Sequence, residues 1–167
     1  MELNICGDAE ASGSLIKQST DWSWILKDLE ATRALGRYLV QQAERPSLLL
    51  LEGTLGAGKT SLVQGIASAI GIDEPITSPT FALAQHYPQG KPPLVHLDLY
   101  RLELPAVAND LFLQEEEEAV GMGAILVVEW SERLSLDLPD AWRLKLSYRS
   151  EGGRLATLNK SDQFAAG

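Results

Sequence analysis

The sequence predicts an α/β fold: a three-layer sandwich with helices on both faces of a mostly parallel sheet, and an antiparallel hairpin near the C-terminus. Three observations favour it. The run Leu48–Leu51 is apolar without alternation, which is typical of a strand covered on both faces. Further apolar runs at 94–100 and 125–130 are separated by a segment with helical character. Near the end, 143–148 and 154–158 flank a Glu-Gly-Gly turn, which indicates a hairpin.

Length and composition restrict the class of protein. We expect one domain over 21–167, and a small, polar, frayed segment over 1–20. The net charge of -9 argues against a chain that holds nucleic acid on its own basic surface. Cys6 is the only cysteine, which excludes a disulfide framework and a thiolate metal cluster. The sequence has neither signal-peptide order nor an apolar run of about 18 residues. We therefore expect a cytoplasmic protein with no membrane partner.

The first helix is expected to begin after Asp28, a suitable N-cap, and to run from Leu29 to Glu44. Apolar residues recur along it at helical spacing. Pro46 disfavours helical geometry at the residue before it, so the helix should end just ahead of the leucine strand.

A phosphate-binding loop follows the leucine strand. Gly53, Gly58, Lys59 and Thr60 satisfy the pattern G-x-x-x-x-G-K-[ST]. The glycines allow a tight turn whose N–H groups point at an anion. Lys59 supplies a compact positive charge for the outer phosphates, and the Thr60 hydroxyl can ligate magnesium. The next helix directs its N-terminus at the same anion, so the fold is predicted to be of the P-loop NTPase type.

The phosphate-loop helix is expected to end near Ile70, with Gly71 at its C-terminal cap. A possible strand at 82–87 precedes a turn rich in proline and glycine at 88–93. Thr80 lies in the loop between the phosphate-loop helix and this strand, where a switch that senses the γ-phosphate often sits. The alternative interpretation, a rigid turn set by the preceding proline, remains open.

Two acids follow apolar strands at the edge where open α/β sheets bind ligands. Asp98 lies at the carboxyl-end part of the strand predicted at 94–100, and Glu129 at that of the strand predicted at 125–130, with a helix between them at 103–120. Either could hold magnesium or orient an attacking water. Alternatively, each could be a structural partner for a nearby arginine.

Three other features are given ordinary interpretations. The sequence at 159–162 matches the guanine-reading N-K-x-D, but too few residues follow it to complete a GTPase domain. The four glutamates at 115–118 are typical of a solvated helix face, although they could dock a basic partner surface. His96 lies in an apolar strand with no neighbouring ligand-type histidine, so we expect it to be packed rather than catalytic.

The motifs together resemble the TsaE family of bacterial ATPases, which are required for threonylcarbamoylation of adenosine next to the tRNA anticodon. The resemblance covers about 28–158 and rests on the phosphate loop and on Ser-Pro-Thr-Phe at 78–81, His-Leu-Asp-Leu-Tyr-Arg-Leu at 96–102 and Val-Glu-Trp at 128–130. The chain departs from it at Thr54, where many relatives have Asp, and at Ser131, where Pro is common.

The resemblance implies ATP and Mg2+ as cofactors and assigns residue roles. Thr60 and Glu129 would hold magnesium, and Glu129, Asp98 and Thr80 would form the hydrolytic and switch regions. The residues implied to bind the nucleotide are Leu55, Gly56, Ala57, Gly58, Lys59, Thr60, Ser61 and Arg154.

The resemblance also implies partners: the threonylcarbamoyl transferase subunit and its companion subunit, with tRNA met only through the complex. ATP turnover would reset this assembly and would be weak without it. Two other functions remain open from the residues alone, a small-molecule kinase and a nucleotide-gated binding module with little catalysis.

Overall fold

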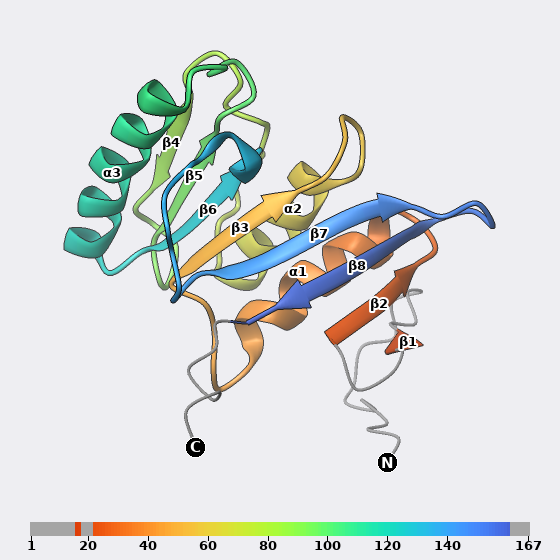
Figure 1. Cartoon of the computed structure of the whole chain (residues 1–167). Coiled ribbons are helices and arrows are strands. Elements are labelled where there is room, and N and C mark those ends of the chain that lie inside the picture. Colours follow the sequence, from red (N-terminus) through yellow and green to blue (C-terminus); the bar gives the residue numbers. More distant parts are fainter. Residues whose placement is uncertain (1–15, 18–21, 161–167) are drawn as a thin grey trace, which may run out of the picture.

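The computed structural model describes residues 16–17 and 22–160. Its sheet has eight strands in the order β1-β2-β8-β7-β3-β6-β5-β4 (Figure 1). The strands are β1 (Ile16–Lys17), β2 (Trp22–Leu26), β3 (Leu48–Glu52), β4 (Ala84–Tyr87), β5 (Leu94–Asp98), β6 (Ile125–Glu129), β7 (Trp142–Tyr148) and β8 (Arg154–Asn159). The pairings among β7, β3, β6 and β5 are parallel, and those at both margins are antiparallel.

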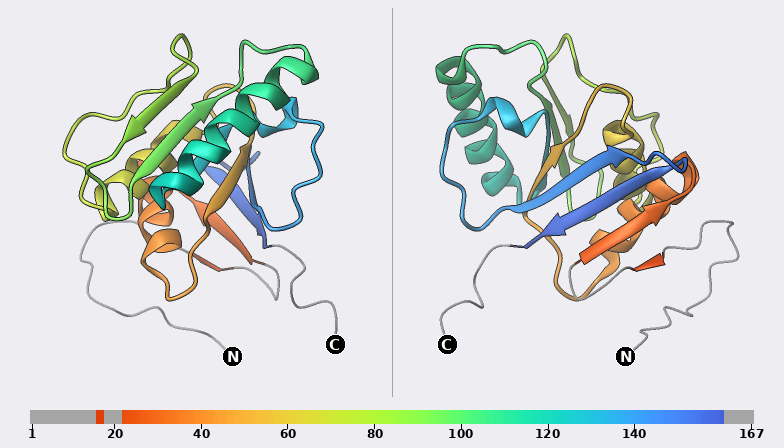
Figure 2. Two further views of the ribbon diagram at one scale, coloured as in Figure 1. Left: turned by 90° about the vertical axis from the view of Figure 1, so that its left-hand side faces the viewer. Right: turned by 45° about the vertical axis from the view of Figure 1, so that its right-hand side comes forward.

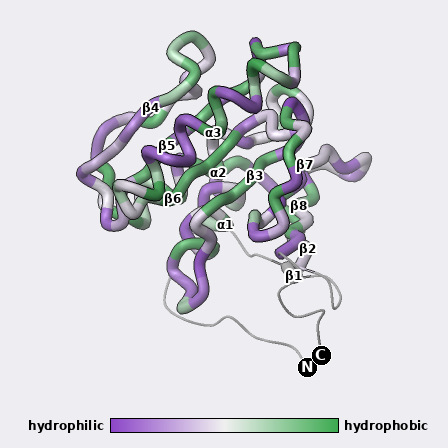
Figure 3. The backbone as a smooth tube through the Cα atoms, turned by 60° about the vertical axis from the view of Figure 1, so that its left-hand side comes forward, coloured by the Kyte–Doolittle hydropathy of each residue, from purple (hydrophilic) through white to green (hydrophobic). Residues whose placement is uncertain are grey.

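Helices cover both faces of this sheet. On one face lie α1 (Leu29–Gln41) and α2 (Lys59–Ala69), and on the other lies α3 (Pro105–Met122) (Figure 2). Two hydrophobic clusters fill the two interfaces. All residues of β5 and β6 are buried, and Figure 3 shows the largely hydrophobic character of the central strands. The predicted three-layer α/β fold with a C-terminal antiparallel hairpin is confirmed.

Glycine sets the close approach of α1 and α2. A Cβ added at Gly36 would lie 2.2 Å from the carbonyl oxygen of Leu62, and one added at Gly65 would lie 2.0 Å from that of Arg33. Only glycine allows the two backbones to come this close. The contact brings α1 beside the N-terminal turns of α2, next to the phosphate loop.

Several element boundaries differ from the predictions. Asp28 caps α1 as predicted, and its side chain accepts a hydrogen bond of 2.8 Å from the Ala31 N–H. The helix ends at Gln41 rather than Glu44, because Gln42 already has extended backbone geometry. The second half of the sandwich shows smaller shifts: β4 begins two residues later than predicted, β5 ends at its acid, and α3 covers 105–122 rather than 103–120.

The N-terminal part of the sheet was not predicted. The alternating sequence of β2 buries Trp24 and Leu26, and β2 pairs with β8 in antiparallel register. The frayed segment expected at 1–20 lies outside the described residues except at Ile16–Lys17, which pair with β2 as β1. Of the helices in the described part of the chain, none has the length and apolar character required to cross a bilayer.

Candidate functional site

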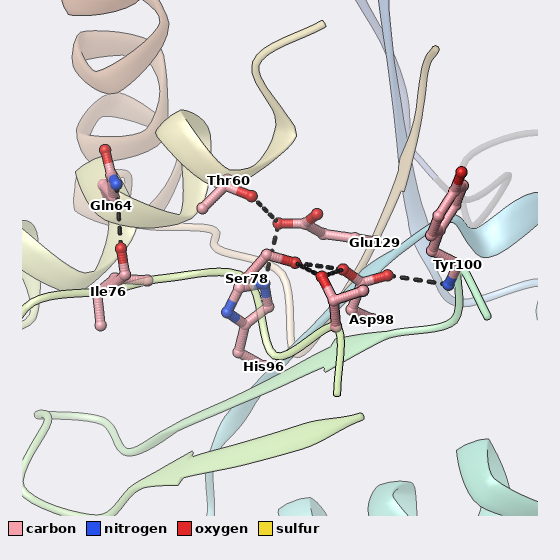
Figure 4. Close-up of polar contacts among 9 residues, drawn as sticks. Thr60, Gln64, Ile76, Ser78, His96, Asp98, Tyr100 and Glu129 are labelled. Atoms are coloured by element: carbon pink, nitrogen blue, oxygen red, sulfur yellow. Dashed lines mark hydrogen bonds and ion pairs between the residues drawn. The ribbon is translucent and has the colours of Figure 1, made fainter. Parts of the chain in front are cut away.

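The phosphate loop and both predicted acids meet at one edge of the sheet. Because β3, β6 and β5 are parallel, their carboxyl ends lie side by side. The register pairs Leu51 with Glu129 and Asp98 with Glu129. Residues that are far apart in sequence, such as Thr60 and Glu129, thereby come within hydrogen-bonding distance (Figure 4).

The loop has the backbone geometry of an anion cradle. Gly56 has φ 80° and Gly58 has φ 108°, both in the left-handed region that glycine adopts without strain. Gly58 is the N-cap of α2, and its carbonyl accepts the Leu62 N–H at 3.0 Å. The first turn of α2 therefore points its free N–H groups into the loop, as phosphate binding requires.

Lys59 is folded into this cradle. It is only 5% exposed, and its Nζ donates hydrogen bonds to the carbonyl oxygens of Gly53 at 2.6 Å and Thr54 at 3.0 Å. The ammonium also lies 4.3 Å from the centre of the Trp130 ring. Burial lowers the pKa of Lys59 from its usual value, while nearby carboxylates, chiefly that of Glu129, oppose the shift. The site thus holds a partly desolvated cation that an anionic ligand would stabilise.

Thr60 and Glu129 form a direct link between α2 and β6. The Thr60 hydroxyl donates to Glu129 Oε1 at 2.8 Å, and Glu129 is buried. Hydroxyl and carboxylate oxygens are the hard ligands that Mg2+ prefers. Because these two groups sit at the N-terminus of the phosphate-loop helix, their chemistry fits a magnesium ion bound together with a polyphosphate.

Asp98 ties the neighbouring loop to the end of β5. Its Oδ2 accepts hydrogen bonds from the hydroxyls of Ser78 and of Thr80, the latter at 3.3 Å, and its Oδ1 accepts the Tyr100 N–H at 2.9 Å. The two hydroxyls are 3.1 Å apart. The Thr80 loop, predicted as a switch or a rigid turn, is therefore held by Asp98. Figure 4 shows Ser78 and Tyr100 against this carboxylate.

The C-terminal hairpin reaches the phosphate loop from the other side. Arg154 Nη2 donates to the Gly56 carbonyl oxygen at 3.1 Å, and the Tyr148 hydroxyl donates to the same oxygen at 2.7 Å. Leu55 is exposed at the loop tip, whereas Ala57 is buried in the core beneath it. Ser61 lies half-buried in the first turn of α2. All the residues predicted to contact nucleotide thus lie in or against one loop.

Comparison with known proteins identifies the family of this chain. The TsaE family model, described as threonylcarbamoyl adenosine biosynthesis protein TsaE, matches residues 26–156. The chain belongs to the TsaE family. It is 44% identical over 134 residues to the tRNA threonylcarbamoyladenosine biosynthesis protein TsaE of Nostoc, covering 80% of this chain and 82% of that protein. The Synechocystis protein of the same name is 46% identical over 114 residues, with coverages of 66% and 71%.

A solved structure has a similar fold over most of its length. The crystal structure of YdiB from Bacillus subtilis superposes with a TM-score of 0.67 at 26% sequence identity. The match covers 87% of this chain and 90% of that one. The matched TsaE span includes the phosphate loop, both acids and Arg154.

Three residues that the structure places at or beside the site were not assigned to it from the sequence. Tyr148 gave no local signal, because only the hairpin's place in the sheet brings its hydroxyl to the loop. Trp130 follows Glu129 with φ 58° and packs on Tyr100 at 4.9 Å between ring centres. Ser131 donates a hydrogen bond to the carbonyl oxygen of Leu51 at 3.2 Å. A non-glycine residue in the left-handed region next to a buried acid is a feature that functional sites often show.

A hollow of about 680 Å³ opens beside the TsaE phosphate loop. Leu55 and Trp130 line it together with Glu132 and residues of β7. Although Glu132 is exposed overall, partial burial of its carboxyl raises the pKa above its usual value, and Glu52 adds to this, whereas a backbone hydrogen bond, Lys59 and Arg133 oppose it. Leu55 at the loop tip therefore lines a recess that also carries the charged residues Glu52, Glu132 and Lys145.

Proposed function

We propose that this chain is a Mg2+-dependent ATPase that acts in threonylcarbamoylation of tRNA. The observation that carries the proposal is the hydrogen bond from Thr60 to Glu129, formed at the N-terminus of α2 inside a glycine loop that holds a buried lysine. A hydroxyl and a carboxylate in this arrangement are what magnesium-nucleotide chemistry requires. The TsaE relatives are named for threonylcarbamoyladenosine biosynthesis in tRNA, which suggests the pathway.

Each group has a distinct task in this proposal. The loop N–H groups and Lys59 bind the phosphates, and Thr60 and Glu129 hold magnesium, directly or through water. Magnesium, when bound, neutralises charge that develops on the phosphate oxygens. Asp98, with Thr80 in the loop that it holds, would orient the attacking water or respond to loss of the γ-phosphate. Arg154 would approach the nucleotide from the hairpin.

We further propose that turnover is weak in isolation and resets an assembly made of the threonylcarbamoyl transferase subunit and its companion. The net charge of -9 leaves little capacity for binding tRNA directly, so tRNA would be met only through the complex. Nucleotide state would be transmitted by the loops that carry Thr80 and Trp130, since both touch groups at the phosphate site. The proposed compartment is the cytoplasm.

The test is a measurement of ATP turnover and tRNA binding by the chain alone and after addition of the two partner proteins and tRNA. We expect slow turnover alone, a large increase with partners, and no tight tRNA binding by the isolated chain. In cells, depletion of the chain should remove threonylcarbamoyladenosine from tRNA, measured by mass spectrometry of nucleosides. Full turnover without partners would contradict the resetting role, and absence of turnover in every mixture would contradict the ATPase.

A further inference from the structure

A histidine lies beneath the proposed magnesium site. His96 is the central residue of β5 and is fully buried, with 0% exposed area. Leu94 on β5 and Val127 on β6 belong to the cluster that faces α1 and α2. Because strand side chains alternate, His96 and Glu129 point to that same face. The imidazole therefore lies on the side of the sheet that carries the phosphate-loop helix.

The histidine contacts the acid directly. His96 Nε2 lies 3.0 Å from Glu129 Oε1, the same oxygen that accepts the Thr60 hydroxyl at 2.8 Å (Figure 4). An ionised carboxylate only accepts hydrogen bonds, so the imidazole must carry its proton on Nε2 and donate. Two donors from two different elements thus converge on one carboxylate oxygen.

Packing alone does not explain a histidine at this position. The other nitrogen of the ring, Nδ1, is buried and has no hydrogen-bond partner among the described residues. A buried polar atom without a partner destabilises a fold, and an aliphatic residue would fill the same place without that loss. The neighbouring β5 positions Val95 and Leu97 are aliphatic and equally buried. The residue type is therefore accounted for by its bond to Glu129.

The bond also restrains where Glu129 can turn. Lys59 is close enough for the Glu129 charge to act on its pKa. A carboxylate free to rotate could pair with this ammonium and compete with the phosphates for it. With Oε1 held by two donors, the carboxylate stays directed at Thr60, and Lys59 keeps its contacts with the loop carbonyls.

We propose that His96 is a positioning residue that holds Glu129 against Thr60 and so keeps the magnesium site assembled. This inference rests on the proposed ATPase function but adds a residue that does not itself touch nucleotide. Groups that orient metal ligands in this way commonly contribute about 10- to 100-fold to metal affinity or activity.

The test compares amide substitutions that place their N–H groups differently. The glutamine amide of His96→Gln can occupy the position of Nε2 and donate to Glu129, whereas the shorter asparagine of His96→Asn cannot reach it. His96→Leu removes both nitrogens. We expect the kcat for ATP to fall about 10- to 100-fold in His96→Asn and His96→Leu, with KM little changed, and to recover in His96→Gln. Equal kcat in the Gln and Asn variants, or an unchanged kcat in the Leu variant, would overturn the proposal.

A second readout separates this inference from the ATPase itself. ADP affinity is measured by calorimetry with and without Mg2+ for the native chain and each variant. The gain in affinity on adding Mg2+ should shrink in His96→Asn and His96→Leu and persist in His96→Gln, even if no variant hydrolyses ATP. A gain that is the same in all four proteins, or absent in the native chain, would refute the role of His96. Thermal unfolding shows whether each variant is folded, and the Gln-to-Leu comparison decides the matter should His96→Asn fail to fold.

Discussion

Replacing Lys59 by alanine tests the phosphate cradle most directly. The ammonium donates to the carbonyl oxygens of Gly53 and Thr54, and a bound phosphate must compete with these contacts. A hydrogen bond to a charged group contributes about 1.5–3 kcal/mol net. Because the carbonyl contacts are given up on binding, we expect the lower part of that range, which corresponds to an affinity loss of about 10- to 30-fold.

The assay is calorimetric titration with magnesium-ADP and with a non-hydrolysable ATP analogue. The matched control is Lys91→Ala, which removes an exposed lysine from the turn before β5 and should leave the affinity unchanged. Thermal unfolding should show Lys59→Ala to be folded, since the variant removes a buried cation whose pKa burial has lowered. Unchanged affinity of Lys59→Ala for both nucleotides would refute the assignment of this loop as the phosphate site.

Three further predictions concern stability and the two acids. Gly65→Ala should lower the free energy of unfolding by about 1–3 kcal/mol in chemical denaturation, because its Cβ would lie 2.0 Å from a carbonyl oxygen of α1. Gly121→Ala should be neutral or slightly stabilising, because a Cβ there would meet nothing outside its own stretch of helix within 4 Å. Glu129→Ala should impair Mg2+-dependent turnover more than nucleotide binding. If turnover survives in Glu129→Ala but is lost in Asp98→Ala, the metal-binding and hydrolytic roles proposed for the two acids must be exchanged. Glu132 has a raised pKa in the folded state, so its contribution to stability is fully present below the pKa of the unfolded chain and is lost as pH rises through the folded pKa. Glu132→Gln should therefore raise the melting temperature slightly near neutral pH but not near pH 4. The effect should be small because the residue is exposed. A gain in melting temperature of equal size at both pH values would contradict this prediction.

Local chemistry explains why much of the site could be predicted from the sequence. The phosphate loop follows from a fixed spacing of Gly53, Gly58, Lys59 and Thr60, whose backbone requirements act over a few residues. Strands without alternation predict burial on both faces, and parallel strands bring their carboxyl ends to one edge. Glu129, at the end of such a strand, was therefore expected there from local pattern and topology together.

Only the tertiary structure decided which groups touch. Sequence position does not reveal that Glu129 bonds Thr60 while Asp98 bonds the Thr80 loop, because that depends on the register between β5 and β6. The same holds for His96, which the pattern predicted as packed and which is also bonded to Glu129.

The hairpin shows the physical reason. Its two strands follow from local alternation and a glycine turn, but its place beside β3 follows from the order in which the sheet buries its apolar faces. That order brings Tyr148 and Arg154 to the Gly56 carbonyl and lets β2 pair with β8. Backbone conformation and hydrophobic periodicity are encoded over a few neighbouring residues, so the sequence alone determined the fold class and the loop. Contacts between distant segments depend on the packing of the whole chain, so the tertiary structure decided which residues of the site form hydrogen bonds with one another.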